Sequence, residues 1–438
     1  MKRALLLALW TVAGCAGPPA SGQDVTLAVF SADVTPPIGH PLCGGMVKPA
    51  ERVADSLFAR GFVLRGGGQR PVLFVALDWT ELRNDAYEAW RTALADAAGT
   101  SAERVLVHCA HQHDAPYADL EAQRILDQAG LRGFHVDPAF HARALADVAA
   151  AVRAARPERV THVGTGEAVV ERIASNRRVV VDGRPTFKRY SRTADPAIRD
   201  APEGLIDPTL KTLSFWSDDR PLAALSLYAT HPMSRYGTGA VSADFIGQAR
   251  ARRQSALPQV LQIYATGCSG DVTAGKYNDG RPEPLADRLE SAMARAWEST
   301  RRVPLDRFDL RVARVSFDVP AVRLVDPAAS RSEQLMAALG LSWAKRRDRP
   351  VDVPSLDVGA AQLLLLPGEA FVEFQLHAQR IRPEQFVAVA GYGECGPGYI
   401  PTESARAEGY VDEHGYCWVA AGAEARLKRA IEEALGRR

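Results

Sequence analysis

The chain has 438 residues, of which 47% are hydrophobic and 24% are charged. This is the composition of an ordinary globular protein, and the length allows a large buried core. The 53 basic and 52 acidic residues leave a net charge of +1, so no basic field is available to hold a polyanion. The composition therefore gives no support to binding of nucleic acid.

The N-terminus has the layout of an export signal. Lys2 and Arg3 form a short positive start, and residues 4–12 form an apolar stretch that is too short to span a bilayer. No later apolar run is long enough to cross a membrane. We therefore expect the protein to be exported.

Small residues stand directly before Cys15, which resembles a bacterial lipobox whose cysteine is acylated after cleavage. We predict a lipoprotein signal peptide over residues 1–15 and a flexible tether over residues 16–24. The protein would then lie in the cell envelope, periplasmic or on the outer membrane, anchored to the membrane surface through Cys15, or be secreted. The alternative is a plain signal peptide cut near Ala20, which would remove Cys15.

Five more cysteines follow, and their spacing fits no zinc-knuckle pattern. Cys395 and Cys417 flank one loop-rich segment and could form a disulfide in an oxidising compartment. The other three are Cys43, Cys109 and Cys268.

Strand-like apolar runs alternate with amphipathic runs, which predicts an α/β fold with a mixed β-sheet core layered with helices. Residues 71–77 (PVLFVAL), 85–98 and 104–107 form a strand–helix–strand unit. No internal repeat is apparent and no linker divides the chain, so we expect a single catalytic domain over residues 25–438. Further strands are predicted at 213–216, 223–228, 259–264, 310–317, 361–366 and 386–390, and helices at 138–155, 244–254, 284–300, 331–346, 369–380 and 421–435.

Two histidines, His111 and His113, follow the predicted strand that ends near Val107. In an extended segment, side chains two residues apart point the same way, so both can face one site beyond the strand end. Imidazole is a common zinc ligand, although a chance pair of polar residues explains this motif alone equally well. His108 precedes the turn, and we interpret it as structural.

Two further polar residues have equivalent places. His231 follows the predicted strand 223–228, and Glu369 lies where the strand 361–366 gives way to a helix. A second histidine at a strand end favours a metal site over coincidence. Glu369 is either a metal ligand or a charge at the start of a helix.

Two glycine-rich segments also follow predicted strands. Residues 266–273 (TGCSGDVT) present backbone N–H groups to an anion or oxyanion, or form an ordinary turn capped by Asp271. Residues 391–401 contain four glycines and two prolines, and Tyr392 and Tyr399 there line a pocket or simply pack. Five distant segments thus place polar groups where loops at a sheet edge build a site.

Taken together, these motifs resemble the neutral, non-lysosomal ceramidases along nearly the whole chain, and the order of the motifs is preserved. HQHDAP, residues 111–116, matches the family motif HTHSGP in three of six positions. The other matching blocks are residues 33–39 (DVTPPIG) with 41–44, Asn176-Arg177, His231-Pro232, 242–245 (SADF), 270–273 (GDVT), 367–369 (PGE) and Gly398-Tyr399.

The resemblance implies a zinc amidase that cleaves the N-acyl bond of ceramide, or of a related N-acyl lipid, to a fatty acid and an amine. It implies one zinc ion per chain, held by His111, His231, Glu369 and Tyr399. Other N-acylated amines and lipoamino acids suit the same chemistry, because a fold does not fix a substrate.

The resemblance also implies the groups that act beside the metal. His113 corresponds to the acid/base or substrate-contacting histidine, and Arg177 to the arginine that holds the reacting carbonyl. Tyr410 is the candidate for a further family tyrosine, with Tyr416 in reserve. Any role of the family's serine in the GDVS motif passes to Thr273.

The chain departs from the family pattern at Asp114-Ala115, where the family has Ser-Gly. This adds a carboxylate that could orient His113 or raise its pKa. The typical β-rich C-terminal domain has no counterpart in this sequence, and we expect the catalytic core to stand without it.

Two other functions fit parts of the pattern. A catalytically silent envelope protein that binds a ligand on the same scaffold is suggested by the altered residues Asp114, Thr273 and Ala274, and the retained ligand set argues against it. A barrel-type metal hydrolase also begins with His-x-His, but it needs eight βα units. The glycine-rich tyrosine loop in the last third of the chain does not fit that class.

Overall fold

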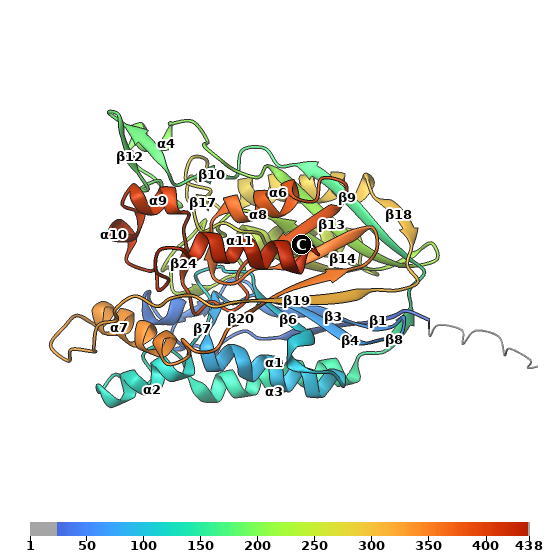
Figure 1. Ribbon diagram of the computed structural model, residues 1–438, viewed down its shortest axis with the longest axis horizontal. Helices are drawn as coiled ribbons and strands as arrows, with labels where there is room; N and C mark the ends of the chain where they lie inside the picture. The colour runs from blue at the N-terminus through green and yellow to red at the C-terminus, as the bar shows by residue number, and fades with distance from the viewer. Residues whose placement is uncertain (1–23, 437–438) are drawn as a thin grey trace, which may run out of the picture.

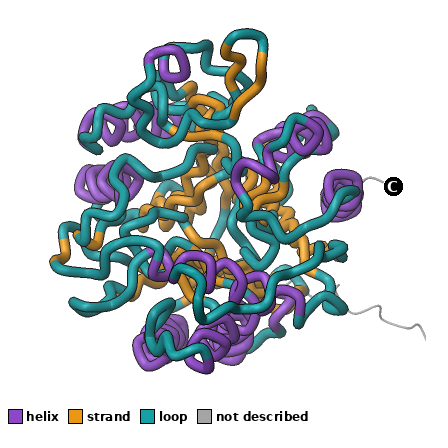
Figure 2. Tube along the Cα trace, turned by 90° about the vertical axis from the view of Figure 1, so that its left-hand side faces the viewer, coloured by secondary structure: helices purple, strands orange, loops and turns teal. Residues whose placement is uncertain are grey.

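The computed structural model describes residues 24–436. The predicted signal peptide, Cys15 and nearly all of the predicted tether lie outside that range. Within it, no helix combines the length and the apolar character needed to cross a bilayer. The sheets form the interior and the helices cover them, as the end-on view in Figure 2 shows most clearly.

The first sheet has the strand order β6-β4-β3-β1-β8. Neighbouring strands are antiparallel except β4 and β6, which are parallel because helix α1 (Asn84–Ala98) connects them. Helix α3 (Pro138–Ala154) packs beside α1, and in Figure 1 both lie below the sheet. The strands are β1 (Thr26–Asp33), β3 (Phe58–Gly66), β4 (Gln69–Leu77), β6 (Val105–Cys109) and β8 (Pro157–Arg159).

The second sheet repeats this arrangement with the order β16-β14-β13-β9-β18. Again only the pair joined through a helix, β14 and β16, is parallel, and that helix is α5 (Asp244–Ala256). Helix α6 (Glu283–Glu298) packs against α5. The strands are β9 (His162–Val169), β13 (Thr209–Ser217), β14 (Arg220–Tyr228), β16 (Leu261–Thr266) and β18 (Arg301–Pro304).

The third sheet has the order β19-β20-β21-β23, which is the same pattern without the last edge strand. Helix α8 (Val372–Arg380) connects the parallel pair β21 and β23, and α11 (Ala423–Ala434) packs beside α8. The strands are β19 (Asp309–Val315), β20 (Val351–Asp357), β21 (Ala361–Leu365) and β23 (Phe386–Ala390).

The chain therefore contains a topological repeat, and the expectation of no internal repeat is wrong. Backbone details repeat as well: α1 and α5 both begin with a residue of positive φ, Asn84 at 51° and Asp244 at 54°. The second residues after β6 and β23, His111 and Tyr392, also have positive φ, at 72° and 52°. The units share a hydrophobic pattern and a turn geometry but few side chains, so the sequence does not display the repeat.

The inner faces of the three sheets meet in one central apolar cluster. Phe62 stacks on Phe74 within the first sheet and contacts Phe215 of the second, with ring centroids 5.6 and 5.0 Å apart. Leu363 of the third sheet belongs to the same cluster. Each outer face has its own cluster beneath its helices, so the strand ends of all three units are held at fixed positions around one core.

Short paired strands lie toward the left of Figure 1, the end that faces the viewer in Figure 2. The pairs are β5 (Glu81–Leu82) with β7 (Tyr117–Ala118), β10 (Ser175–Asn176) with β17 (Val272–Thr273), β22 (Glu369–Ala370) with β24 (Tyr399–Ile400), β2 (Arg52–Val53) with β15 (Ala240–Val241), and β11 (Val179–Val181) with β12 (Arg184–Thr186). The remaining helices are α2 (Leu120–Gln128), α4 (Pro196–Arg199), α7 (Arg331–Ala344), α9 (Glu403–Ala407) and α10 (Tyr410–His414), with short 3-10 turns at Cys43–Gly45 and Ala102–Arg104.

The α/β class and every strand and helix predicted from the sequence are confirmed, with boundaries that differ by up to four residues. The helix predicted from residue 369 begins at Val372, because Glu369 pairs with Tyr399 between β22 and β24. The predicted disulfide is wrong: Cys395 and Cys417 are free thiols. They belong to different hydrophobic clusters, and each sulfur donates to a nearby backbone carbonyl.

Candidate metal centre

Three side chains from the three repeated units meet at one point. His111 follows β6, His231 follows β14 and Glu369 follows β21. The Nε2 atoms of the two histidines lie 3.1 Å apart, and Oε2 of Glu369 lies 3.2 Å from the first and 3.0 Å from the second. All three residues are buried. The strand ends that the sequence singled out therefore converge.

The backbone fixes which nitrogen of each histidine faces the centre. Nδ1 of His111 donates to the carbonyl of Thr80 at 2.9 Å, and Nδ1 of His231 donates to that of Ser269 at 2.5 Å. Each ring therefore presents a lone pair on Nε2 to the centre. Burial lowers the pKa of His231 to about 4, which keeps this imidazole neutral.

The three facing atoms fit a small cation. Two nitrogen lone pairs and a carboxylate oxygen repel one another at 3.0–3.2 Å unless a positive charge lies between them. Tetrahedral zinc with bonds of about 2.0–2.1 Å places its ligand atoms about 3.3 Å apart, close to these separations. Burial opposes the ionisation of Glu369, yet its contacts with His111 and His231 hold its pKa well below the ordinary value.

His113 lies at the side of this centre. One of its ring nitrogens is within 4.8 Å of the ligand nitrogens of His111 and His231, and its Nδ1 is 3.5 Å from Sγ of Cys43. Burial, followed by the neighbouring histidines, lowers the pKa of His113 well below the ordinary value, so the ring is neutral. The extended-segment argument for His-x-His is wrong in detail, because His111 has a φ of 72°.

Asp114 does not act on His113. Its carboxylate accepts from the N–H of Gly237 at 2.9 Å and from the hydroxyl of Thr238 at 2.6 Å. It therefore fixes the loop that follows His231, and the expected rise in the pKa of His113 is wrong. His108 is structural as predicted, because its two nitrogens pair with the backbone of Gly391 and Thr266.

Arg177 and Tyr399 form a buried pair. The guanidinium donates to the Tyr399 hydroxyl at 2.8 Å, and no carboxylate lies within ion-pair distance of it among the residues from 24 to 436. Asp271 places this segment: its carbonyl accepts from the N–H of Arg177 and its carboxylate from the side chain of Asn176. Tyr399 is next to Glu369 in the β22–β24 register, and its role as a fourth ligand remains a prediction.

The two candidate tyrosines differ in their hydroxyl partners. The hydroxyl of Tyr410 is buried and has no hydrogen-bond partner among residues 24–436, and its ring packs 5.6 Å from that of Tyr399. The hydroxyl of Tyr416 contacts Glu81, Arg83 and Tyr117. Tyr410 therefore has a free donor beside Arg177, whereas Tyr416 is fully engaged.

The hydrogen bonds of the glycine-rich segment 266–273 give little support to an anion site there, and that interpretation stays a prediction. The N–H groups of Gly267, Cys268 and Gly270 all donate within the protein. The hydroxyl of Thr273 donates to the carbonyl of Arg189 at 3.2 Å and accepts from Gly275. The Thr273 hydroxyl thus connects its own segment to the one that contains Arg189. These contacts give no support to the reactive role that the resemblance implied.

Sequence reasoning missed one buried group and undervalued another. Glu81, after β4, lies 4.0 Å from Nδ1 of His111 and accepts from Tyr416 at 3.0 Å. Tyr392 stacks on His111, with centroids 4.0 Å apart, and its hydroxyl pairs with Ser269 at 2.8 Å. Glu81 follows a strand end, as the ligands do, and that placement was the available signal.

No family model matches the sequence, and no curated protein matches it. Solved structures do match it. A structure described as a ceramidase complexed with C2 superposes with a TM-score of 0.71 over 94% of this chain and 75% of its own, at 15% identity. Neutral ceramidase from Pseudomonas aeruginosa gives a TM-score of 0.70 over 94% and 74%, also at 15% identity. The chain therefore has the neutral ceramidase fold, and the barrel interpretation is wrong.

Proposed function

We propose that this chain is a zinc-dependent hydrolase that cleaves the N-acyl amide bond of ceramide or a related N-acyl lipid. The convergence of His111, His231 and Glu369 on one point carries the proposal. Two imidazoles and a carboxylate are a common zinc ligand set in hydrolases, which leaves a position for water. The similarity of the fold to ceramidases supports the same class of reaction.

A bound zinc ion would lower the pKa of water from about 15.7 to about 7, which supplies a nucleophile at neutral pH. Neutral His113, beside the centre, takes the proton of the attacking water and gives it to the leaving nitrogen. The C–O bond forms first and gives a tetrahedral intermediate. The C–N bond then breaks as the nitrogen is protonated, and the products are a fatty acid and an amine. The amide oxygen becomes negatively charged on the way.

Arg177 and Tyr410 stabilise that negative charge. The guanidinium is buried, has no ion-pair partner within the described part of the chain, and is held in place by Asp271 and Tyr399. The unpartnered hydroxyl of Tyr410 is a second donor. Donors held in position before the reaction, in a site without bulk water, are worth more than the same donors in water.

The alternative of a silent binding protein has less support. The departures that suggest it, Asp114 and Thr273, have structural partners, and neither removes a group from the centre. Export and anchoring through Cys15 are further parts of our proposal, because a lipid anchor would bring the site to lipid substrates. The signal-like start of the sequence supports them.

The test is to measure metal content and hydrolysis together. Purified protein without residues 1–22 is assayed for bound metal and for cleavage of a fluorogenic N-acyl sphingosine and a short-chain N-acyl amine. We expect one zinc per chain and chelator-sensitive cleavage, both lost in His111→Ala. Zinc without cleavage of either amide would contradict the amidase assignment, and equal metal content in His111→Ala and the unmodified protein would contradict the ligand set.

A further inference from the structure

A cavity of about 410 Å³ lies beside the metal centre. Two segments form it: residues 190–192, which follow β12, and residues 233–238, which follow the ligand His231. The side chain of Asn278 donates to the carbonyls of Ser191 and Ser234, at 2.8 and 3.0 Å. The two walls are therefore tied together, and the cavity is formed before any ligand binds.

The cavity is connected to the groups proposed to act in the reaction. On one side, the Tyr236 ring stands edge-on to His113, with centroids 5.7 Å apart. On the other side, Tyr190 contacts His414, whose ring packs 4.4 Å from that of Tyr410. His113 delivers a proton to the leaving amine, so the amine half of a substrate lies toward this cavity.

The polar lining of the cavity suits an anion. It contains two arginines, Arg192 and Arg235, and no acidic side chain. Arg192 forms no ion pair with any residue in the part of the chain that the structure describes, and it lies against Gly280, where an added Cβ would be 3.0 Å from the guanidinium. The hydroxyl of Ser191 is buried and has no hydrogen-bond partner among the residues that the structure describes. Arg235 contacts Glu283 at 3.6 Å, but both are partly exposed, so this pair is weak.

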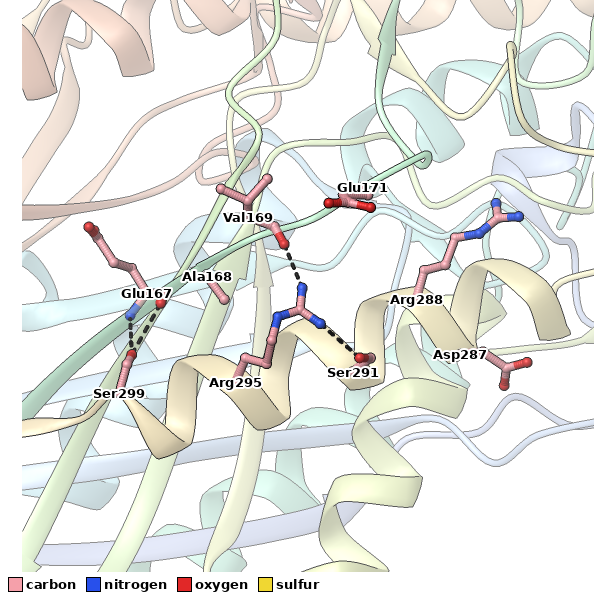
Figure 3. A pocket seen from close by; sticks show the side chains of 9 residues that line it. All are labelled: Glu167, Ala168, Val169, Glu171, Asp287, Arg288, Ser291, Arg295 and Ser299. Atoms are coloured by element: carbon pink, nitrogen blue, oxygen red, sulfur yellow. Dashed lines mark hydrogen bonds between the residues drawn. The ribbon is translucent and has the colours of Figure 1, made fainter.

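A second cavity, of about 670 Å³ between β9 and α6, shows the contrast (Figure 3). Both of its arginines are already engaged: Arg295 with the carbonyl of Val169 and with Ser291, and Arg288 with the carbonyl of Arg172. Its lining carries acidic groups as well as basic ones, including Glu171 and Asp287. The lining of this second cavity thus has mixed charge, whereas the charged side chains that line the cavity beside the metal centre are all basic.

We propose that the cavity of Ser191, Arg192 and Arg235 binds a small anionic group, a carboxylate or a phosphate, on the amine half of the substrate. The preferred substrate is then an N-acyl amino acid or a similar anionic amide, not a neutral ceramide. This inference rests on the proposed amidase function. Charge-assisted hydrogen bonds to a guanidinium give both the affinity and the orientation.

The test compares matched amides on the metal-loaded enzyme. The substrates are N-octanoylserine, its neutral analogue N-octanoylserinamide, N-octanoylethanolamine and its O-phosphate. We expect kcat/KM for N-octanoylserine to exceed that for the serinamide by about tenfold or more. A larger gain for the O-phosphate over N-octanoylethanolamine would identify phosphate as the preferred anion.

Arg192→Gln should remove most of the advantage of the acid, an approximately tenfold loss, and change hydrolysis of the serinamide by less than about twofold. Arg302→Gln, an exposed arginine on β18, is the control for a general loss of positive charge and should change neither. Equal rates for acid and amide in the unmodified enzyme, or an equal loss of both in Arg192→Gln, would overturn the inference.

Titration calorimetry with N-octanoylserine separates this inference from the amidase proposal. If no amide is cleaved, but the acid binds and Arg192→Gln weakens that binding while the serinamide does not bind, the anion site stands and the amidase proposal fails. If the acid is neither cleaved nor bound, the anion site fails. The amidase proposal fails with it only if none of the neutral amides is cleaved either.

Discussion

The ligand histidines and the groups proposed to act on the substrate differ in how completely their polar atoms are hydrogen-bonded. The side chains of His111 and His231 use their outer nitrogen on a backbone carbonyl, so each ring has one orientation and one lone pair left. The groups placed to act on a substrate each retain a buried atom without a partner: Nε2 of His113, Nε of Arg177 and the hydroxyl of Tyr410.

Residues that hold a metal require one fixed orientation, whereas residues that act on a substrate require a free polar atom with which to contact it. An unpartnered buried polar atom costs about 1–3 kcal/mol of stability, so few are found in native proteins without a reason. A substrate carbonyl, a water and a leaving nitrogen would give these three groups their partners. The predictions below test whether the unpartnered atoms mark function.

The largest effect is expected at His113. His113→Ala should keep one zinc per chain and lower kcat by about 10²–10⁴, because the ring moves a proton but does not hold the metal. Metal analysis and turnover of the same preparation check this. Loss of the metal together with activity would show that His113 is a third imidazole ligand, which its distance within 4.8 Å of the others allows.

The sequence predicted the fold class and the strand ends well because both rest on local patterns. Strands such as β4 and β23 are continuous apolar runs, which signal burial on both faces. Strands β1, β3, β9 and β20 are among those that the sequence analysis did not predict. Of these, β3 contains Gly61 and β20 contains Pro354, residues that normally argue against a strand. Gly61 is needed there, because an added Cβ would lie 2.1 Å from the carbonyl of Phe74.

The sequence predicted those residues of the site that directly follow a strand. His111, His231 and Glu369 were found because each follows an apolar strand. The true partner of Asp114, the loop at residues 237–238, lies more than a hundred residues away, and no spacing rule connects them. The cavity beside the centre depends in the same way on Asn278, which ties two distant segments.

A smaller effect is expected at Tyr410. Tyr410→Phe should lower kcat/KM by about 10²-fold if its hydroxyl stabilises the oxyanion. It should not lower the free energy of unfolding and should raise it by up to about 1–3 kcal/mol, because no hydrogen bond is lost and an unpartnered buried hydroxyl is removed. Tyr416→Phe is the matched comparison, and it should cost about 1–3 kcal/mol of stability, because Glu81 and Arg83 lose a buried partner.

Denaturant unfolding and turnover of both variants decide the point. A Tyr410→Phe enzyme of normal rate would remove this residue from the mechanism. A Tyr410→Phe protein that is as destabilised as Tyr416→Phe would show that the hydroxyl has a partner after all, and the rule that unpartnered atoms mark function would fail at this position.

The smallest effect tests the rule outside the site. Glu373, in α8, also has an unpartnered carboxyl oxygen, and burial together with the charge of Asp271 raises its pKa to about 8. Because this folded-state pKa is higher than the ordinary value of about 4.3, the native state holds a proton that the unfolded chain has lost. The stability from this proton is fully present below about pH 4.3 and disappears as the pH rises toward 8.

Glu373→Gln removes that titration. Its Tm should therefore rise relative to the unmodified protein between pH 5 and pH 8.5, by about 2 °C. The exposed Glu384→Gln should show no such trend, and thermal melts of both variants at the two pH values provide the measurement. If the Tm difference between Glu373→Gln and the unmodified protein does not change with pH, the carboxyl of Glu373 is ionised in the folded state. In that case Asp271, which places Arg177, would have a second negative charge beside it, and the position of the guanidinium would depend on that repulsion.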